Sequence, residues 1–228
     1  MTTSIASQLE LLQQEIAKSR EKRVNFPDNV RLIAVSKRQP LDKIEEAYQC
    51  GHRDFGENFV QEGVEKIQKL DKSDIQWHML GAIQSRKCKD IATHFDWVQS
   101  VDRLKVIKKL DQAREGLPPL NVCIQVNLFG EEQKAGVDST SCFELAEAIQ
   151  EAEHLTLRGI MALPPKQTEY EKQLAQFDKI AALYRQLSDK YPQVDILSMG
   201  MSGDFEAAIA AGSNMIRVGT AIFGSRDS

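Results

Sequence analysis

Short apolar segments alternate along the chain with longer segments in which apolar residues recur every three or four positions. The first pattern is typical of strands covered on both faces, and the second of amphipathic helices. The short segments predict eight strands, at residues 31–36, 53–58, 76–82, 96–101, 121–128, 157–163, 195–201 and 215–223. The longer ones predict helices at residues 40–51, 60–70, 102–116, 139–153, 168–191 and 203–212, and residues 84–95 show the weakest helical pattern.

One more amphipathic pattern precedes the first strand. Its apolar side chains recur at helical spacing: Ile5, Leu9, Leu12 and Ile16. Thr3 or Ser4 is the expected N-cap, since a hydroxyl can accept a hydrogen bond from the first turn. Glu10 and Glu15 interrupt any apolar stretch that a secretory signal needs. We therefore expect residues 1–22 to form a helix packed on the rest of the fold.

Eight strands, each followed by a helix, predict an α/β fold of the (β/α)₈ barrel type. The rival is a doubly wound open sheet, but no glycine-rich GxGxxG follows the first strand. The barrel and its additional N-terminal helix use the whole chain, so we expect residues 1–228 to be a single domain.

Composition removes several classes of function. The net charge of −4 supplies no basic footprint for nucleic acid, and no apolar run approaches the length that spans a membrane. The four cysteines form no CxxC pair and the four histidines show no HxxxH spacing: Cys50, Cys88, Cys123 and Cys142, with His52, His78, His94 and His154. We therefore expect no metal and no disulfide, and a reduced cytosol as the compartment.

A lysine follows the first predicted strand. In barrels of this type, catalytic and binding groups lie at the C-terminal ends of the strands, which is where Lys37 falls. Burial lowers the pKa of a lysine and makes its amine a nucleophile for Schiff-base formation. The alternative is a surface lysine beside Arg38.

The ends of the last two strands carry groups suited to an anion. Met201, Ser202 and Gly203 stand immediately ahead of a helix, and Gly219 and Thr220 follow the core of the last strand. Hydroxyl groups and backbone N–H groups in such loops bind phosphate in many barrel enzymes. The alternative reading is a plain N-cap at the first place and a tight turn at the second.

Charged residues near these strand ends need partners. Arg217 falls inside the last predicted strand, so either a carboxylate or a ligand is expected beside it. Gly56, Glu57 and Asn58 end the second strand in a place suited to ligand contacts, and Glu57 could instead serve only to balance Arg53 or Arg217. A Schiff-base lysine facing a phosphate site suggests pyridoxal phosphate. An arginine against its pyridine nitrogen would weaken the ring as an electron sink.

Four segments carry a family resemblance that spans essentially the whole chain: LIAVSK, DFGENFVQEGVEKI, WHMLGAIQSRK and LSMGMSGDFEAAIAAGSNMIRVGTAIFG. They resemble the signature segments of the YggS/PROSC family of pyridoxal phosphate homeostasis proteins, whose cyanobacterial members are called PipY. The resemblance implies a fold type III barrel, like the N-terminal domain of alanine racemase. It implies these cofactor-binding residues: Lys37 as the aldimine lysine, Ser202, Gly219 and Thr220 at the phosphate, Arg217 facing the pyridine nitrogen, and Asn58 and Met201 beside the cofactor.

The same resemblance implies a monomer that buffers pyridoxal phosphate and delivers it to apo-enzymes, affecting amino-acid and keto-acid balance without catalytic turnover. Racemases of this fold use a tyrosine from a second domain as the opposing acid/base. The tyrosines here fall on predicted outer helices or their edges: Tyr48, Tyr170, Tyr184 and Tyr191. Two alternatives stay open. One is a pyridoxal-phosphate enzyme such as an amino-acid racemase, and the other is a cofactor-free aldolase-type barrel.

Overall fold

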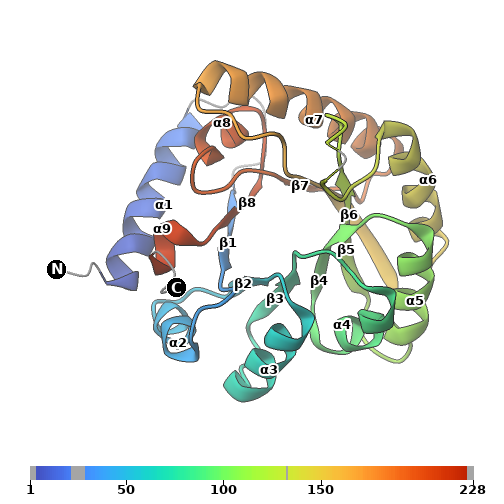
Figure 1. The fold of residues 1–228 in the computed structure, drawn as a ribbon, viewed down its shortest axis with the longest axis horizontal. Helices are drawn as coiled ribbons and strands as arrows, with labels where there is room; N and C mark the ends of the chain where they lie inside the picture. The colour runs from blue at the N-terminus through green and yellow to red at the C-terminus, as the bar shows by residue number, and fades with distance from the viewer. Residues whose placement is uncertain (1–3, 22–28, 132, 225–228) are drawn as a thin grey trace.

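Eight parallel strands close into a barrel in the order β1 to β8 (Figure 1). The structure is a computed structural model that describes residues 4–21, 29–131 and 133–224. The strands are β1 (Arg31–Val35), β2 (Asp54–Glu57), β3 (Gln76–Met79), β4 (Trp97–Val101), β5 (Leu120–Val126), β6 (Leu155–Ala162), β7 (Ile196–Ser198) and β8 (Met215–Val218). The first and last strands pair in parallel, with Ile33 opposite Arg217, and complete the ring. The predicted (β/α)₈ fold is confirmed.

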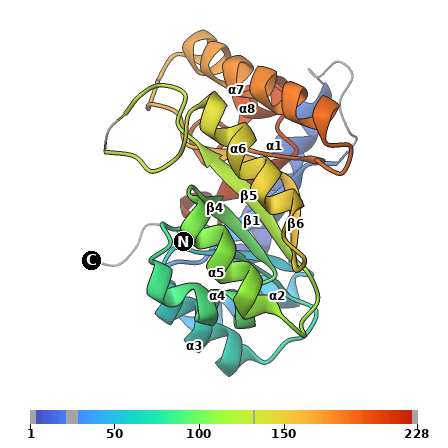
Figure 2. The same cartoon turned by 90° about the vertical axis from the view of Figure 1, so that its right-hand side faces the viewer.

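Helices surround the strands (Figures 1 and 2). They are α1 (Ile5–Glu21), α2 (Leu41–Gln49), α3 (Val60–Leu70), α4 (Cys88–His94), α5 (Leu104–Arg114), α6 (Ser139–Gln150), α7 (Tyr170–Lys190), α8 (Phe205–Ala210) and α9 (Thr220–Phe223), and a 3₁₀ helix, η1 (Ser85–Lys87), precedes α4. The weakly patterned residues 84–95 thus form a short 3₁₀ turn and a two-turn helix.

The barrel has an apolar core on each side of its strands. The larger core lies between the strands and the helices, which explains why the strand segments are continuously apolar. A smaller one fills the interior: Ile33, Leu80, Trp97, Cys123, Met161, Ile196 and Met215. Polar and charged residues are also buried in the described barrel strands: Glu57, His78, Gln99, Ser100, Gln125, Ser198 and Arg217.

The N-terminal helix α1 packs on three helices of the outer layer. The Ser4 hydroxyl accepts a hydrogen bond from the Ser7 N–H at 3.2 Å, which makes Ser4 the cap. Thr3 and residue 22 lie outside the described residues. The four apolar side chains of the helix are buried: Ile5, Leu9, Leu12 and Ile16. Helix α1 contacts α2, α8 and α9, so it lies beside the shortest helix of the outer layer (Figure 1).

The prediction of one strand over residues 215–223 is wrong in its second half. Strand β8 ends at Val218, Gly219 caps a helix, and α9 begins at Thr220. Ile222 and Phe223 are buried in this helix, so their hydrophobicity reflects burial without specifying extended backbone. Thr220 therefore occupies the first turn of a helix instead of a strand position.

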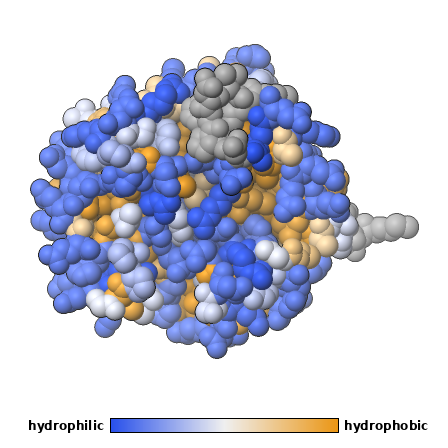
Figure 3. Space-filling view, turned by 180° about the vertical axis from the view of Figure 1, so that it is seen from behind, coloured by the Kyte–Doolittle hydropathy of each residue, from blue (hydrophilic) through white to orange (hydrophobic). Residues whose placement is uncertain are grey.

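The outer surface is mostly hydrophilic when viewed from behind Figure 1, with apolar residues visible between the polar ones (Figure 3). Among the helices that the structure describes, none combines the length and the hydropathy needed to cross a membrane.

Candidate functional site

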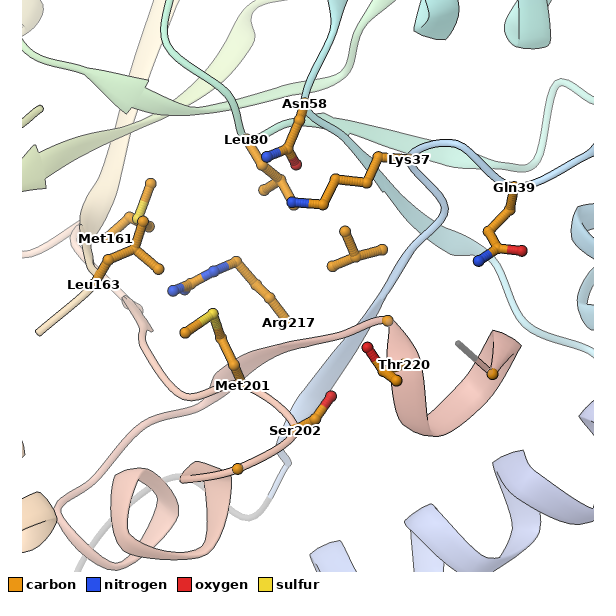
Figure 4. A pocket seen from close by; sticks show the side chains of 14 residues that line it. Lys37, Gln39, Asn58, Leu80, Met161, Leu163, Met201, Ser202, Arg217 and Thr220 are labelled. Carbon is orange, nitrogen blue, oxygen red and sulfur yellow. The ribbon is translucent and has the colours of Figure 1, made fainter. Parts of the chain in front are cut away.

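A cavity of about 340 Å³ opens at the C-terminal ends of the strands. The seven residues predicted as a site all line it (Figure 4): Lys37, Asn58, Met201, Ser202, Arg217, Gly219 and Thr220. The remaining lining residues are Val35, Gln39, Leu80, Met161, Leu163, Gly203 and Gly224. The structure thus brings together groups from β1, β2, β3, β6, β7 and β8 or the loops that follow them, and the barrel topology is what makes these distant segments neighbours.

Lys37 lies in a tight turn that follows β1. The Gln39 N–H donates to the Ser36 carbonyl at 3.0 Å and closes the turn around Lys37 and Arg38. Arg38 has a φ of 58°, in the left-handed region that side chains other than glycine rarely adopt. In Figure 4 the Lys37 side chain extends into the pocket, with its amine on the side of Asn58 and Leu80.

The loop after β7 is held from both sides. The Met201 N–H donates to Asp204 Oδ1 at 2.6 Å, and the Met201 carbonyl accepts from the N–H groups of Asp204 and Phe205 at 3.1 and 3.0 Å. Gln173 of α7 donates to the Gly203 carbonyl at 3.2 Å. These bonds fix the backbone of the loop and leave the Ser202 hydroxyl directed toward the pocket (Figure 4).

Thr220 presents a second hydroxyl group beside this loop (Figure 4). The Gly219 carbonyl accepts from the N–H groups of Ile222 and Phe223 at 3.0 and 2.9 Å. The first N–H groups of a helix have no acceptor within that helix, so those of Thr220 and Ala221 remain available to a ligand. Ser202 and Thr220 therefore present two hydroxyl groups at the same side of the pocket.

Arg217 reaches the pocket from inside the barrel. Its Nη1 donates to the Ser198 hydroxyl at 2.7 Å and its Nη2 to the Ala162 carbonyl at 2.9 Å. Burial lowers the pKa of Arg217 to about 10, although Asp204 nearby opposes the change. Both recorded partners are neutral oxygens. The sequence predicts either a carboxylate or a ligand beside Arg217. Among the described residues, no carboxylate forms an ion pair with Arg217.

A buried chain of hydrogen bonds continues from Arg217 through the barrel. The Ser198 hydroxyl donates to Gln99 Oε1 at 2.5 Å, and Gln99 Nε2 lies 3.1 Å from His78 Nδ1. His78 Nε2 lies 3.1 Å from Asp54 Oδ1. Burial lowers the pKa of His78 to about 4, so the ring is neutral, and its partners assign the proton to Nε2. Polar residues within otherwise buried strand segments are the sequence signal that could have revealed this chain.

Glu57 pairs with other residues than the Arg53 or Arg217 that the sequence suggests. Its Oε1 accepts from Lys66 Nζ at 2.9 Å and from the Ser36 hydroxyl at 2.5 Å. Arg53 pairs instead with Asp74 at 2.6 Å, so the proposal that Glu57 balances Arg53 or Arg217 is wrong. Burial raises the pKa of Glu57, and the charge of Lys66 opposes that rise.

Among the described residues that line the pocket, two side chains carry an ionisable group, Lys37 and Arg217, and both are basic. The tyrosines lie in α2 and α7, except Tyr191, which follows α7, and none of them lines the pocket. The part of the chain that the structure describes contains no group of three or more side chains suited to a metal. The pocket therefore offers positive charge, hydroxyl groups and apolar walls, which suit an anionic ligand with a flat apolar portion.

Comparison with known proteins gives consistent relatives. Residues 9–227 match the family "Alanine racemase, N-terminal domain". The pyridoxal phosphate homeostasis protein of Vibrio alginolyticus is 48% identical over 230 residues, covering 99% of each chain. That of Escherichia coli K12 is 45% identical over 227 residues, covering 98% of this chain and 97% of the relative.

Solved structures agree with these relatives. PipY of Synechococcus elongatus, solved with pyridoxal phosphate bound, is 36% identical with a TM-score of 0.84, covering 97% of this chain and 100% of PipY. An alanine racemase of Clostridium difficile shares the fold at 15% identity and a TM-score of 0.73, covering 97% of this chain and 57% of the racemase. With curated relatives at such identity over nearly the full length, the chain belongs to the pyridoxal phosphate homeostasis protein family, a branch of proteins with the alanine racemase N-terminal domain.

Proposed function

We propose that this pocket binds pyridoxal 5′-phosphate through Lys37 and that the protein holds and delivers the cofactor as part of intracellular pyridoxal phosphate homeostasis. The names of its relatives and the cofactor-bound structure of PipY support this function. The bound group would supply an aldehyde that a lysine amine can attack and a ring that withdraws electrons. The protein supplies the amine, the anion site and the walls.

The donor set of the pocket fits this group. Ser202, Gly219 and Thr220 would hold the phosphate, since two hydroxyl groups and the adjoining backbone N–H groups meet there. Arg217 would face the pyridine nitrogen as a donor that keeps this nitrogen unprotonated, because a guanidinium cannot accept a proton. Asn58 and Met201 would lie beside the ring.

The proposal that the protein holds the cofactor without converting a substrate rests on one observation. The described lining residues include no second acid or base. Racemisation needs a proton donor and acceptor on the face opposite the lysine. The described residues that line the pocket include no carboxylate, histidine, tyrosine or cysteine. Arg217 would oppose protonation of the ring nitrogen, which would further lower the reactivity of a bound amino acid. The protein is therefore proposed as a carrier without catalytic turnover.

The proposal extends to the whole chain. Residues 1–228 form one domain, and the protein acts as a monomer in the cytosol, handing the cofactor to apo-enzymes and so influencing amino-acid and keto-acid balance. Buried thiols support a reducing compartment, because Cys88, Cys123 and Cys142 are free and enclosed in the core.

Absorption spectroscopy tests the binding site. The purified protein mixed with pyridoxal phosphate should show a cofactor band that borohydride converts into a stable adduct, and peptide mapping should find that adduct on Lys37. Lys37→Ala should lose the band and the adduct, while Lys108→Ala, on the exposed face of α5, should keep both. An adduct on another lysine, or an unchanged Lys37→Ala variant, would overturn the assignment.

Isotope-labelled amino acids test the absence of turnover. The loaded protein should exchange its cofactor with an added amine at most once per site. Conversion of many equivalents of one enantiomer into the other would make the protein an enzyme. A protein that forms a borohydride adduct with a sugar phosphate but takes up no pyridoxal phosphate would instead favour the aldolase-type alternative.

A further inference from the structure

The turn that carries Lys37 is held by a buried ionic cluster outside the pocket. We propose that Glu57, Lys66 and Glu62 position Lys37 and so set how strongly the protein holds its cofactor. This inference rests on the proposed function of Lys37. None of the three side chains lines the pocket, so they act through the backbone of the turn.

The cluster forms hydrogen bonds with Ser36, the residue before Lys37. Lys66 Nζ donates to the Ser36 carbonyl at 2.7 Å, the same oxygen that accepts the N–H of Gln39. The Ser36 hydroxyl donates to Glu57 Oε1 at 2.5 Å, and the Ser36 N–H donates to the Gly56 carbonyl at 3.0 Å. Both polar ends of Ser36 are therefore fixed by residues of β2 and α3.

The cluster also forms a hydrogen bond with Arg38, the residue after Lys37. The Arg38 N–H donates to Glu62 Oε1 at 2.5 Å, and the same oxygen accepts from Lys66 Nζ at 2.6 Å. This bond holds Arg38 at its positive φ, a conformation that an arginine would otherwise leave. The Arg38 guanidinium lies 5.6 Å from the centre of the Phe59 ring.

The cluster removes charged groups from water, which costs free energy, and a contribution to stability alone does not explain this cost. Lys66 is 6% exposed and Glu57 is fully buried, so two charges are removed from water. One lysine faces two carboxylates, and Glu57 Oε2 is buried without a hydrogen-bond partner among the described residues. Buried ion pairs of this kind are often replaceable by apolar residues without loss of stability. Their use here is geometric, because every bond to the turn flanks Lys37.

Loss of the cluster should release the turn and move the Lys37 amine away from the position that the pocket requires. A displacement of about 1 Å at a reacting group can lower its efficiency on the order of a hundredfold. Lys66→Met removes the donor to Ser36 and leaves two carboxylates unpaired. Glu62→Gln is milder, because the amide oxygen can still accept from the Arg38 N–H while the charge is lost.

Two measurements test the proposal on these variants. The first is competitive labelling of lysines with acetic anhydride in the cofactor-free protein, read peptide by peptide by mass spectrometry and normalised to the other lysines. The second is a spectroscopic titration with pyridoxal phosphate. Arg114→Met is the matched control, since Arg114 is also 6% exposed and donates to backbone carbonyls, those of Ala92 and Phe95, and does not line the pocket.

In Lys66→Met, the normalised labelling of Lys37 should rise and the affinity for pyridoxal phosphate should fall about ten- to a hundredfold. Glu62→Gln should change both in the same direction and by less, and Arg114→Met should change neither. If Lys66→Met does not fold, Glu62→Gln carries the test. Unchanged labelling of Lys37 in a folded cluster variant would overturn the positioning role. Failure of the unaltered protein to bind pyridoxal phosphate would overturn the proposed function instead, and the labelling result would still stand.

Discussion

The buried His78 should make the protein lose stability as the pH falls from neutral toward 4. The ring is fully buried between Gln99 and Asp54, and burial lowers its pKa to about 4 in the folded protein. In the unfolded chain a histidine titrates near 6.5. Between these two pKa values, His78 is protonated in the unfolded chain and neutral in the folded protein. The free energy of unfolding therefore rises with pH and falls as acid is added.

The size of the effect follows from the two pKa values. A difference of about 2.5 pKa units corresponds to about 3 kcal/mol, with nearly half of the loss complete at pH 5.5. Protonation would also turn Nδ1 into a donor facing the amide of Gln99, which already donates there. The hydrogen-bond chain that ends at Arg217 would then have to rearrange.

Urea unfolding of the cofactor-free protein at pH 7, 5.5 and 4 measures this loss. Tryptophan fluorescence is a suitable signal, because the Trp97 ring stacks on His78 at a centroid distance of 5.3 Å. His78→Gln is the comparison variant, since its amide can serve both neighbours and does not titrate. Asp96, whose pKa burial raises, is common to both proteins and forms no hydrogen bond or ion pair with His78 in the described part of the chain, so its contribution cancels in the difference. If both proteins lose stability equally between pH 7 and 4, His78 is not buried as a neutral ring and the reasoning fails.

Three further variants probe the pocket and the residues behind it. The double change Ser202→Ala and Thr220→Ala should weaken pyridoxal phosphate binding by about two to four orders of magnitude, because bonds to a charged group contribute about 1.5–3 kcal/mol each, while pyridoxal without phosphate should lose nothing; equal losses for both ligands would refute the phosphate assignment. Ser198→Ala removes one of the two recorded acceptors of Arg217, and the absorption spectrum of the bound cofactor should shift while the melting temperature stays within a few degrees. Gly81→Ala should lower stability by about 1–3 kcal/mol and disturb Asn58, since an added Cβ would lie 2.0 Å from the Asn58 carbonyl oxygen; a crystal structure with Asn58 unmoved would contradict this.

Much of the fold could be predicted because hydrophobic periodicity and barrel topology agree. Helix α3 has the predicted bounds, 60–70, since its apolar residues repeat at helical spacing and Asp71 ends it in the left-handed conformation. Strand β8 shows the limit of the method. An apolar run of nine residues has the same composition whether it continues as a strand or turns into a helix at Gly219.

The pocket residues could be named before the structure because each lies at a strand end or in the loop that follows, where barrels place their sites. Their roles toward the cofactor stay predictions. The partners behind them could not be found in the same way. Lys66 reaches Glu57 and Ser36 only because of how α3 is rotated over β2, and sequence spacing does not specify that rotation. Its one signal is a charge three residues after Gly63, on the buried face of the helix.

The pairing of β1 with β8 has a consequence for synthesis of the protein. Lys37 leaves the ribosome early, whereas Arg217, Gly219 and Thr220 come from the other end of the ring. Contacts between such distant segments form last, because the entropy cost of closing a long loop precedes the favourable energy of the contacts. A nascent or prematurely terminated chain therefore carries Lys37 without Arg217, Gly219 and Thr220, and on the function proposed above it would have the amine but lack the phosphate site.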